Sequence, residues 1–223
     1  MMKHVFLTGV PGVGKSTLVK KVCDAVVSAG VSVSGFYTEE VRERGRRVGF
    51  DVVTLTGDRG QLSRLSAQAA AGGRELRVGQ YVVDLQSFES LALPLFRDMR
   101  EGSKRLFVID EIGKMELFSQ AFIRAVRQTL DASSCSILGT IPVPKGKPLA
   151  LVEEVRSRQD VKIFMVKTCF TSLKISKQTS FSPSICMQHS HTHTHTYCRS
   201  FNRCYRNTLF LSFIYFKEFI LTL

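Results

Sequence analysis

Two patterns of apolar residues alternate along residues 4–166. Short apolar runs are typical of buried strands, whereas apolar residues three or four positions apart are typical of helices that bury one face. The short runs predict strands at residues 4–8, 32–38, 79–84, 105–110, 135–140 and 161–166. The longer spacing predicts helices at residues 15–29, 86–100, 115–131 and 148–157.

Two segments interrupt this alternation. Residues 40–55 contain two stretches of strand character around Gly45, which predict an antiparallel hairpin. Residues 57–76 are rich in Gly, Ala and Ser and lack strand periodicity, so we expect a mobile surface loop there. The pattern as a whole predicts an α/β fold: a doubly wound, three-layer domain with a mostly parallel sheet, flanking helices and a β-hairpin insertion. Ligands bind such sheets beyond the carboxyl ends of the strands.

The first predicted strand leads directly into a glycine-rich motif of the form G-x-x-x-x-G-K-S. Its glycines let the backbone turn several N–H groups toward one centre, which is how a P-loop binds phosphate. The helix that follows adds the positive end of its dipole. A glycine-rich turn without a ligand is the alternative. The candidate nucleotide-binding residues of this motif are Gly9, Val10, Pro11, Gly12, Val13, Gly14, Lys15, Ser16 and Thr17.

Three side chains of the motif have chemistry suited to a nucleotide. Lys15 carries a charge that can reach the β- and γ-phosphates, and we expect it to be catalytic as well as binding. Ser16, in the first turn of the helix, offers a hydroxyl ligand to Mg²⁺. Thr17 follows as a further donor to phosphate.

A pair of carboxylates follows the predicted strand at 105–110. Asp110 is the second candidate ligand of Mg²⁺, and Glu111 is placed to polarise an attacking water as a general base. The alternative is that the pair only caps the next helix. The candidate nucleotide-binding residues of this segment are Val108, Ile109, Asp110, Glu111, Ile112, Gly113 and Lys114.

Four stretches of the chain resemble one family. They read F-L-T-G-V-P-G-V-G-K-S-T at 6–17, G-F-Y-T-E-E-V-R at 35–42, V-I-D-E-I-G-K-M-E-L at 108–117 and G-T-I-P-V-P-K-G at 139–146. The chain is similar to the cancer-related nucleoside-triphosphatase family, small P-loop proteins that hydrolyse ATP, GTP and other nucleoside triphosphates. The resemblance implies a nucleoside-triphosphatase domain over residues 1–167, with nucleotide sites in the two segments given above.

Several other polar residues are candidates to contact the phosphates. Each basic residue among them is either an electrophile for the γ-phosphate or a solvated surface charge. Thr140, at a strand end, either hydrogen-bonds the attacking water or a phosphate, or is a plain turn residue. The basic candidates are Arg42, Arg44, Arg46 and Arg47 near the hairpin turn, Arg59 and Arg64 in the expected loop, and Lys114.

The formal charge of +12 does not by itself indicate nucleic-acid binding. Residues 168–223 hold six Lys+Arg and one acidic residue, so the 25 basic and 18 acidic residues that remain give the first 167 residues +7. Such an excess also attracts nucleotides, and the sequence has no basic stripe interleaved with aromatic residues. We therefore expect ATP, GTP, CTP and UTP as partners, no requirement for nucleic acid, and a monomer.

The sequence changes character after Lys167. Residues 168–223 contain a Ser/Thr-rich stretch, the repeat H-S-H-T-H-T-H-T at 189–196 and a final apolar run that is too short to span a membrane. We expect an aberrant or alternative tail that is poorly ordered, because an alternating His-Thr repeat is what a CA-dinucleotide repeat encodes. A Zn²⁺ site formed by these histidines with Cys198 and Cys204 is the alternative.

The amino terminus lacks the long apolar segment of a secretory signal. We therefore expect an intracellular protein with free thiols, located in the cytoplasm, with the nucleus as a second option. Cys23 and Cys135 are expected in or near the core.

Together these features predict Mg²⁺-dependent hydrolysis of nucleoside triphosphates to the diphosphate and phosphate. A P-loop small-molecule kinase and a nucleotide-dependent binding switch are the alternatives. A glutamate directly after the metal-binding aspartate argues against the kinase.

Overall fold

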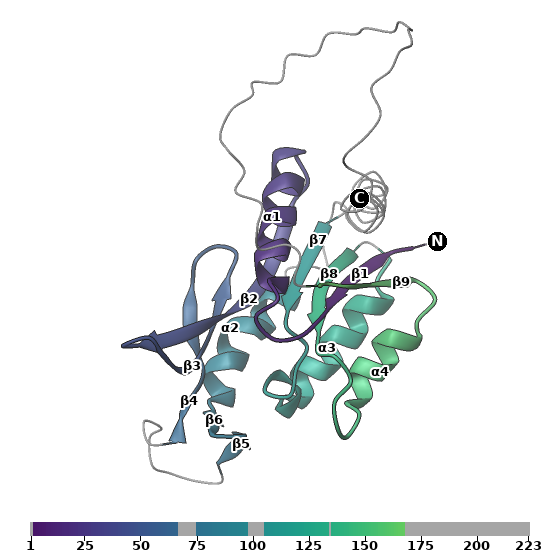
Figure 1. Ribbon diagram of the computed structural model, residues 1–223. Coiled ribbons are helices and arrows are strands. Elements are labelled where there is room, and N and C mark those ends of the chain that lie inside the picture. Colours follow the sequence, from purple (N-terminus) through teal and green to yellow (C-terminus); the bar gives the residue numbers. More distant parts are fainter. Residues whose placement is uncertain (1, 67–74, 98–104, 134, 168–223) are drawn as a thin grey trace, which may run out of the picture.

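Parallel strands form the half of the sheet that leads into the P-loop (Figure 1). The computed structural model describes residues 2–66, 75–97, 105–133 and 135–167. Its nine-stranded sheet has the order β5-β6-β4-β3-β2-β7-β8-β1-β9. The parallel pairs join β2 (Val33–Glu43), β7 (Arg105–Asp110), β8 (Cys135–Ile141), β1 (His4–Thr8) and β9 (Val161–Met165). The P-loop strand β1 therefore lies inside the sheet, between β8 and β9.

Antiparallel strands form the other half of the sheet. The predicted hairpin at 40–55 is confirmed, although β2 continues into its first arm without a break before the chain returns along β3 (Arg46–Thr54). β6 (Tyr81–Val83) and β5 (Leu76–Val78) complete this half where a single strand at 79–84 was expected. Figure 1 shows the β2–β3 hairpin projecting beyond the helices.

The expectation of a surface loop at 57–76 is wrong for its first part. β4 (Arg59–Leu65) pairs antiparallel with β3 on one side and β6 on the other, so its backbone hydrogen bonds are used within the sheet. Leu62 is 1% exposed and belongs to the core, which explains why a Gly- and Ser-containing segment is held as a strand. Residues 67–74 lie outside the described part of the chain.

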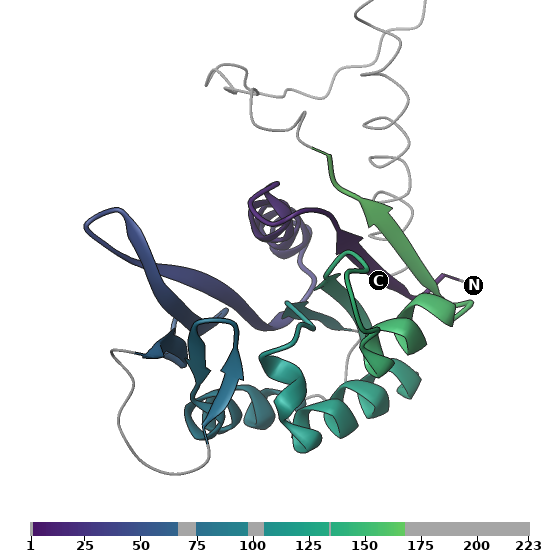
Figure 2. The same cartoon turned by 60° about the horizontal axis from the view of Figure 1, so that its bottom comes forward.

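Helices cover both faces of the sheet, which confirms the three-layer α/β prediction (Figure 2). α1 (Lys15–Ser28) lies on one face. α2 (Leu85–Arg97), α3 (Gln120–Asp131) and α4 (Ala150–Ser157) lie in a row on the other. The helix expected at 86–100 is described as far as Arg97, and the helix expected at 148–157 begins at Ala150.

The continuous helix expected at 115–131 is wrong, because Ser119 interrupts it. A short 3₁₀ helix, η3 (Glu116–Phe118), comes first. Ser119 then takes an extended conformation (φ −79°, ψ 110°), and its hydroxyl accepts a hydrogen bond from the Phe122 N–H at 2.9 Å. This is an N-cap, so α3 begins only at Gln120. The break leaves Glu116 in a separate turn beside the carboxyl end of β7.

The two faces of the sheet have separate hydrophobic cores. Under α2, α3 and α4, four pairs of phenylalanine rings meet edge to face, with centroids 5.2–6.0 Å apart, an arrangement that aromatic quadrupoles favour. A fifth pair is tilted, with centroids 4.7 Å apart. These rings are Phe36, Phe88, Phe96, Phe107 and Phe122. Under α1 the core is aliphatic. As expected, both described cysteines, Cys23 and Cys135, are buried and free.

The predictions for residues 168–223, including the His/Cys metal site, lie outside the described residues. Within the described ranges, no helix has the length and apolar character needed to cross a bilayer.

Candidate active site

The P-loop connects β1 to α1 and is shaped by glycines in the left-handed region. Gly12 has φ 76° and Gly14 has φ 99°, values that side-chain-bearing residues rarely adopt. Gly14 is also the N-cap of α1 and has no side chain to bond the first N–H groups of that helix. These N–H groups are therefore available to an anion at the positive end of the helix dipole.

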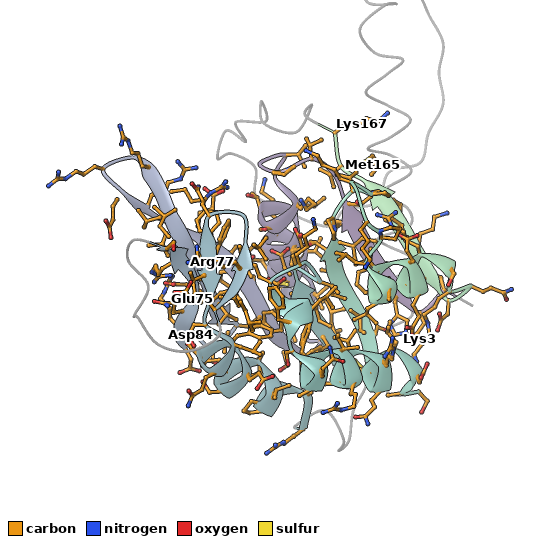
Figure 3. All side chains as sticks on the ribbon, turned by 90° about the horizontal axis from the view of Figure 1, so that it is seen from below. Lys3, Glu75, Arg77, Asp84, Met165 and Lys167 are labelled. Atoms are coloured by element: carbon orange, nitrogen blue, oxygen red, sulfur yellow. The ribbon has the colours of Figure 1, made fainter. Side chains whose placement is uncertain are left out.

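Gly9 is required for a different reason, which is space. A Cβ built on it would stand 2.6 Å from the carbonyl oxygen of Val166, just beyond β9. Val166 in turn donates its N–H to the carbonyl of Thr8 at 2.7 Å. Met165 and Lys167, labelled in Figure 3, mark this end of β9. The start of the P-loop is therefore packed directly against the carboxyl end of the last described strand.

Lys15 extends across the loop. Its side chain is 9% exposed, its Nζ donates to the Gly9 carbonyl at 3.1 Å, and the same nitrogen lies 3.8 Å from Glu111 Oε2. Lys15, the first residue of α1, and Glu111, which directly follows β7, are the two expected catalytic residues, and the fold brings them together.

Asp110 ends β7 and is almost fully buried, with 1% of its surface exposed. Its Oδ1 accepts a hydrogen bond from the Thr140 hydroxyl, whereas its Oδ2 has no hydrogen-bond partner among the described residues. Burial raises the pKa of Asp110, while hydrogen bonding to the hydroxyls of Ser16 and Thr140 and the charge of Lys15 lower it. Thr140 therefore has a hydrogen-bond partner that the sequence did not predict, the Asp110 carboxylate.

This environment fits a divalent cation. A buried carboxylate oxygen without a partner is costly unless an ion or a donor reaches it. The Ser16 hydroxyl interacts with the same carboxyl group. Within the described residues, no group of three or more His, Cys, Asp or Glu side chains is arranged to hold a metal. A metal held only by Asp110 and Ser16 would complete its shell with water and phosphate oxygens, as Mg²⁺ typically does.

Glu111 is partly exposed, at 31% of its side chain, and faces the P-loop lysine. Burial raises the pKa of its carboxyl, the nearby charge of Lys15 lowers it, and the charge of Asp110 raises it. A raised pKa brings a carboxylate closer to the value that suits a general base near neutral pH.

The remaining candidate residues divide by exposure. Val108, Ile109 and Ile112 are fully buried, so their side chains support the site from the core. On the loop, Val13 is buried as well, whereas Val10, Pro11 and Thr17 are exposed. Lys114 is exposed at the start of the turn that follows β7.

Comparison with known proteins agrees with this geometry. The model of a family described as NTPase matches residues 4–170. The chain belongs to this NTPase family.

This NTPase aligns with most of the length of its relatives. The chain is 66% identical to the cancer-related nucleoside-triphosphatase of Homo sapiens over 169 residues, which are 74% of this chain and 89% of the human protein. It is 41% identical to nucleoside-triphosphatase THEP1 of Thermotoga sp. over 161 residues, 72% of this chain and 84% of that protein.

Solved structures give the same result for the fold of the NTPase. The solution structure of a human cancer-related nucleoside triphosphatase has a TM-score of 0.65 at 65% identity, covering 74% of this chain and 89% of that one. The crystal structure of THEP1 from Aquifex aeolicus has a TM-score of 0.62 at 36% identity, covering 73% and 89%. Both values support the same P-loop α/β fold.

The arginines of the hairpin form ion pairs within this NTPase. Arg42 and Arg47 both pair with Glu40, and Arg47 also donates to the Tyr81 hydroxyl at 3.0 Å. Arg44 and Arg46 are exposed at the turn. The pairing of Arg42 and Arg47 favours a structural role over a finger role for these two.

The two arginines expected in a loop lie on β4 and join a charged network. Arg59 pairs with Glu39 and Asp51, and Arg64 pairs with Asp51. Lys20 of α1 closes the network, because its Nζ lies 2.8 Å from Glu39. The network connects the P-loop helix to the antiparallel half of the sheet, so neither arginine is simply solvated.

Glu116 was not predicted to be a site residue, although it belongs to the motif that follows β7. Its side chain is 4% exposed, and its Oε2 accepts the Gly113 N–H at 3.1 Å. The signal that could have revealed it is the spacing itself, a glutamate three residues after a glycine that follows a carboxylate pair. Because we assigned residues 115–131 to one helix, Glu116 was treated as part of an ordinary helical turn.

Proposed function

We propose that this NTPase hydrolyses nucleoside 5′-triphosphates, with ATP, GTP, CTP and UTP as substrates, to the diphosphate and phosphate in a Mg²⁺-dependent reaction. The observation that carries the proposal is the contact across the P-loop between Lys15 Nζ and Glu111 Oε2, at 3.8 Å. This contact joins the lysine of the P-loop motif to the carboxylate that follows β7, which supports a role for both groups at the same phosphate. The relatives' names, which specify nucleoside triphosphates, support the substrate class.

The P-loop binds and orients the phosphates in this proposal. Backbone N–H groups around Gly12 and Gly14 and the amino-terminal end of α1 provide the anion site, and Lys15 adds charge at the β- and γ-phosphates. In this proposal the γ-phosphate competes with Glu111 for the Lys15 amine, which lies 3.8 Å from Glu111 Oε2. Binding of substrate thereby releases the carboxylate.

Ser16 and Asp110 are the residues that would hold Mg²⁺. The chemistry that the bound ion supplies is neutralisation of charge on the phosphate oxygens. Thr140 keeps the Asp110 carboxylate in one orientation through its hydrogen bond to Oδ1, which leaves Oδ2 directed away from that bond.

Glu111 is the general base for water in this proposal. The water oxygen attacks the γ-phosphorus, its proton passes to the Glu111 carboxylate, and the bond between the γ-phosphorus and the bridging oxygen breaks. The diphosphate leaves with the bridging oxygen and its electron pair.

The test is phosphate release from each of the four nucleotides with Mg²⁺, and again with the metal removed by EDTA. We expect Glu111→Gln to keep nucleotide binding but to lose about 10²- to 10⁴-fold in kcat, because it removes the group that accepts the proton from water. We expect Lys15→Ala to weaken both binding and turnover.

Matched controls are Glu154→Gln, a pair-forming glutamate on α4, and Lys21→Ala, an exposed lysine on α1. Both should leave kcat and affinity unchanged. Full turnover by Glu111→Gln would remove Glu111 as the base. Nucleotide binding without phosphate release by the wild type would favour the kinase or the switch.

A further inference from the structure

A second carboxyl group, that of Glu116, lies close to Glu111. Glu116 begins η3, and its buried side chain turns back toward the segment that follows β7. Its Oε2 accepts the Gly113 N–H at 3.1 Å. This bond closes a tight loop between the end of β7 and η3, so that Gly113 and Glu116 hold each other in place.

Gly113 shows how closely the two glutamates approach. A Cβ built on Gly113 would stand 2.9 Å from Glu111 Oε1 and 3.0 Å from Glu116 Oε2. The two carboxyl oxygens are therefore no more than about 6 Å apart, on either side of one backbone position. A side chain at residue 113 would collide with both groups, so the absence of one allows Glu116 to lie against the Glu111 region.

The charges around Glu116 are mainly negative. Glu111 and Asp110 both act on it, and the nearby lysine, Lys15, forms its contact with Glu111 instead. On α2, which packs against η3, Glu89 accepts a hydrogen bond from the Ser119 hydroxyl. Burial, followed by the charge of Glu111, raises the pKa of Glu116 to about 8. This shift favours the neutral form of the Glu116 carboxyl at pH 7.

The hydrogen bond to the Gly113 N–H and the negative charges nearby favour a glutamate at position 116. An apolar side chain would leave the Gly113 N–H buried without a partner, which is costly. A permanently negative group would repel Glu111 and the phosphates. A neutral carboxyl accepts the N–H bond without adding charge.

We propose that Glu116 is a positioning residue for Glu111: it fixes the Gly113 peptide and fills the space close to the Glu111 carboxylate, so that this carboxylate faces the P-loop. The inference rests on the proposed role of Glu111 as general base. Ionisation of Glu116 at alkaline pH adds a second negative charge beside Glu111 and lowers turnover.

The first test compares Glu116→Ala and Glu116→Gln. The alanine variant loses the acceptor for Gly113, and we expect kcat to fall about 10- to 100-fold while KM changes less than about twofold, because misplacing a catalytic group affects the chemical step. The glutamine variant keeps a neutral acceptor of the same size. It should retain kcat at pH 7 and, unlike the wild type, keep it above pH 8.

Ser119→Ala is the matched control for structural damage. It removes the N-cap of α3 at the end of the same turn but does not contact Gly113 or Glu111. Its kcat per folded molecule should equal that of the wild type, with the same pH profile. If Glu116→Ala behaves like Ser119→Ala, or if Glu116→Gln loses activity at the same alkaline pH as the wild type, the positioning role is wrong.

A second readout does not depend on turnover. The NMR resonance of the Gly113 amide reports the ionisation of the carboxyl that it is bonded to, so we expect it to titrate near pH 8 in the wild type. Glu111→Gln should lower this midpoint, because it removes a negative charge beside Glu116. An unchanged midpoint would overturn the inference. This measurement still decides the question if the wild type releases no phosphate, in which case only the proposed function fails.

Discussion

His4 is a buried residue whose two ring nitrogens are both used in the neutral form. Its Nδ1 accepts the Ile137 N–H at 3.0 Å, and its Nε2 donates to the Leu130 carbonyl at 3.0 Å. Protonation of Nδ1 would break the first of these bonds. Burial, with a smaller contribution from the charge of Lys3, lowers the pKa of His4 to about 4. The ring connects β1 to β8 and to the end of α3.

This residue predicts a loss of stability in mild acid. The unfolded chain binds a proton near pH 6.5, whereas folded His4 binds one only near pH 4, so the free energy of unfolding falls as the pH drops between these values. We expect a loss of about 2 kcal/mol at pH 5 relative to pH 7.5 from this group. Urea unfolding of the wild type and of His4→Asn at both pH values measures it.

The difference between the two proteins isolates His4, because other titrating groups contribute equally to both. The Asn variant should be less stable at pH 7.5, but its stability should fall less on acidification. Equal pH slopes would show that His4 does not titrate abnormally.

For single residues, the sequence predicted the candidate site residues that belong to a short motif. It missed residues whose role depends on contacts between elements that are far apart in the sequence. Lys15 and Asp110 follow from short patterns, because the chemistry of phosphate and metal binding restricts the residue types. Glu116 and His4 depend on contacts that form only when separate elements pack. No local pattern distinguishes a buried glutamate from one on the exposed face of a helix.

Among the elements, β4 shows how small residues can belong to a strand. A Cβ on Gly60 would stand 2.4 Å from the Leu91 side chain of α2, so glycine is needed there because the helix lies close. In the sequence, the same glycine belongs to a Gly-, Ala- and Ser-rich segment that predicts a loop. Composition alone cannot separate these two reasons for glycine, whereas the strands around the P-loop were predicted within a few residues because their apolar runs are buried on both faces.

Leu62 tests whether β4 is part of the core. We expect Leu62→Ala to lower the free energy of unfolding by about 2–5 kcal/mol, because it leaves a cavity under α2. Leu65→Ala is the matched control, since Leu65 lies on the same strand but is only partly buried. Chemical denaturation gives both values. Equal, small losses would mean that this strand contributes little to the core.

At the scale of the whole molecule, the described residues contain both cores and every residue of the proposed site. One helix covers one face and three cover the other (Figure 2). The site lies where β1 and β7 end, and β8 lies between them. The chain order of the strands therefore matters less for function than their order in the sheet, which the sequence pattern alone did not predict.

This arrangement predicts that residues 1–167 bind nucleotide without the remainder of the chain. We expect the truncated protein and the full chain to have dissociation constants for a non-hydrolysable ATP analogue within about twofold of each other, because no site residue lies beyond 140. Calorimetry of folded protein measures both. Carrying Lys15→Ala in each version verifies that the P-loop is being measured. Binding by the full chain alone would assign residues 168–223 a part in the site.

The contact between Gly9 and the Val166 carbonyl joins positions that are far apart in the sequence. The phosphate loop is thus a neighbour of the point where the last strand ends. A shift of the backbone at Val166 would therefore act directly on the first residues of the phosphate loop, without passing through the helices that cover the sheet.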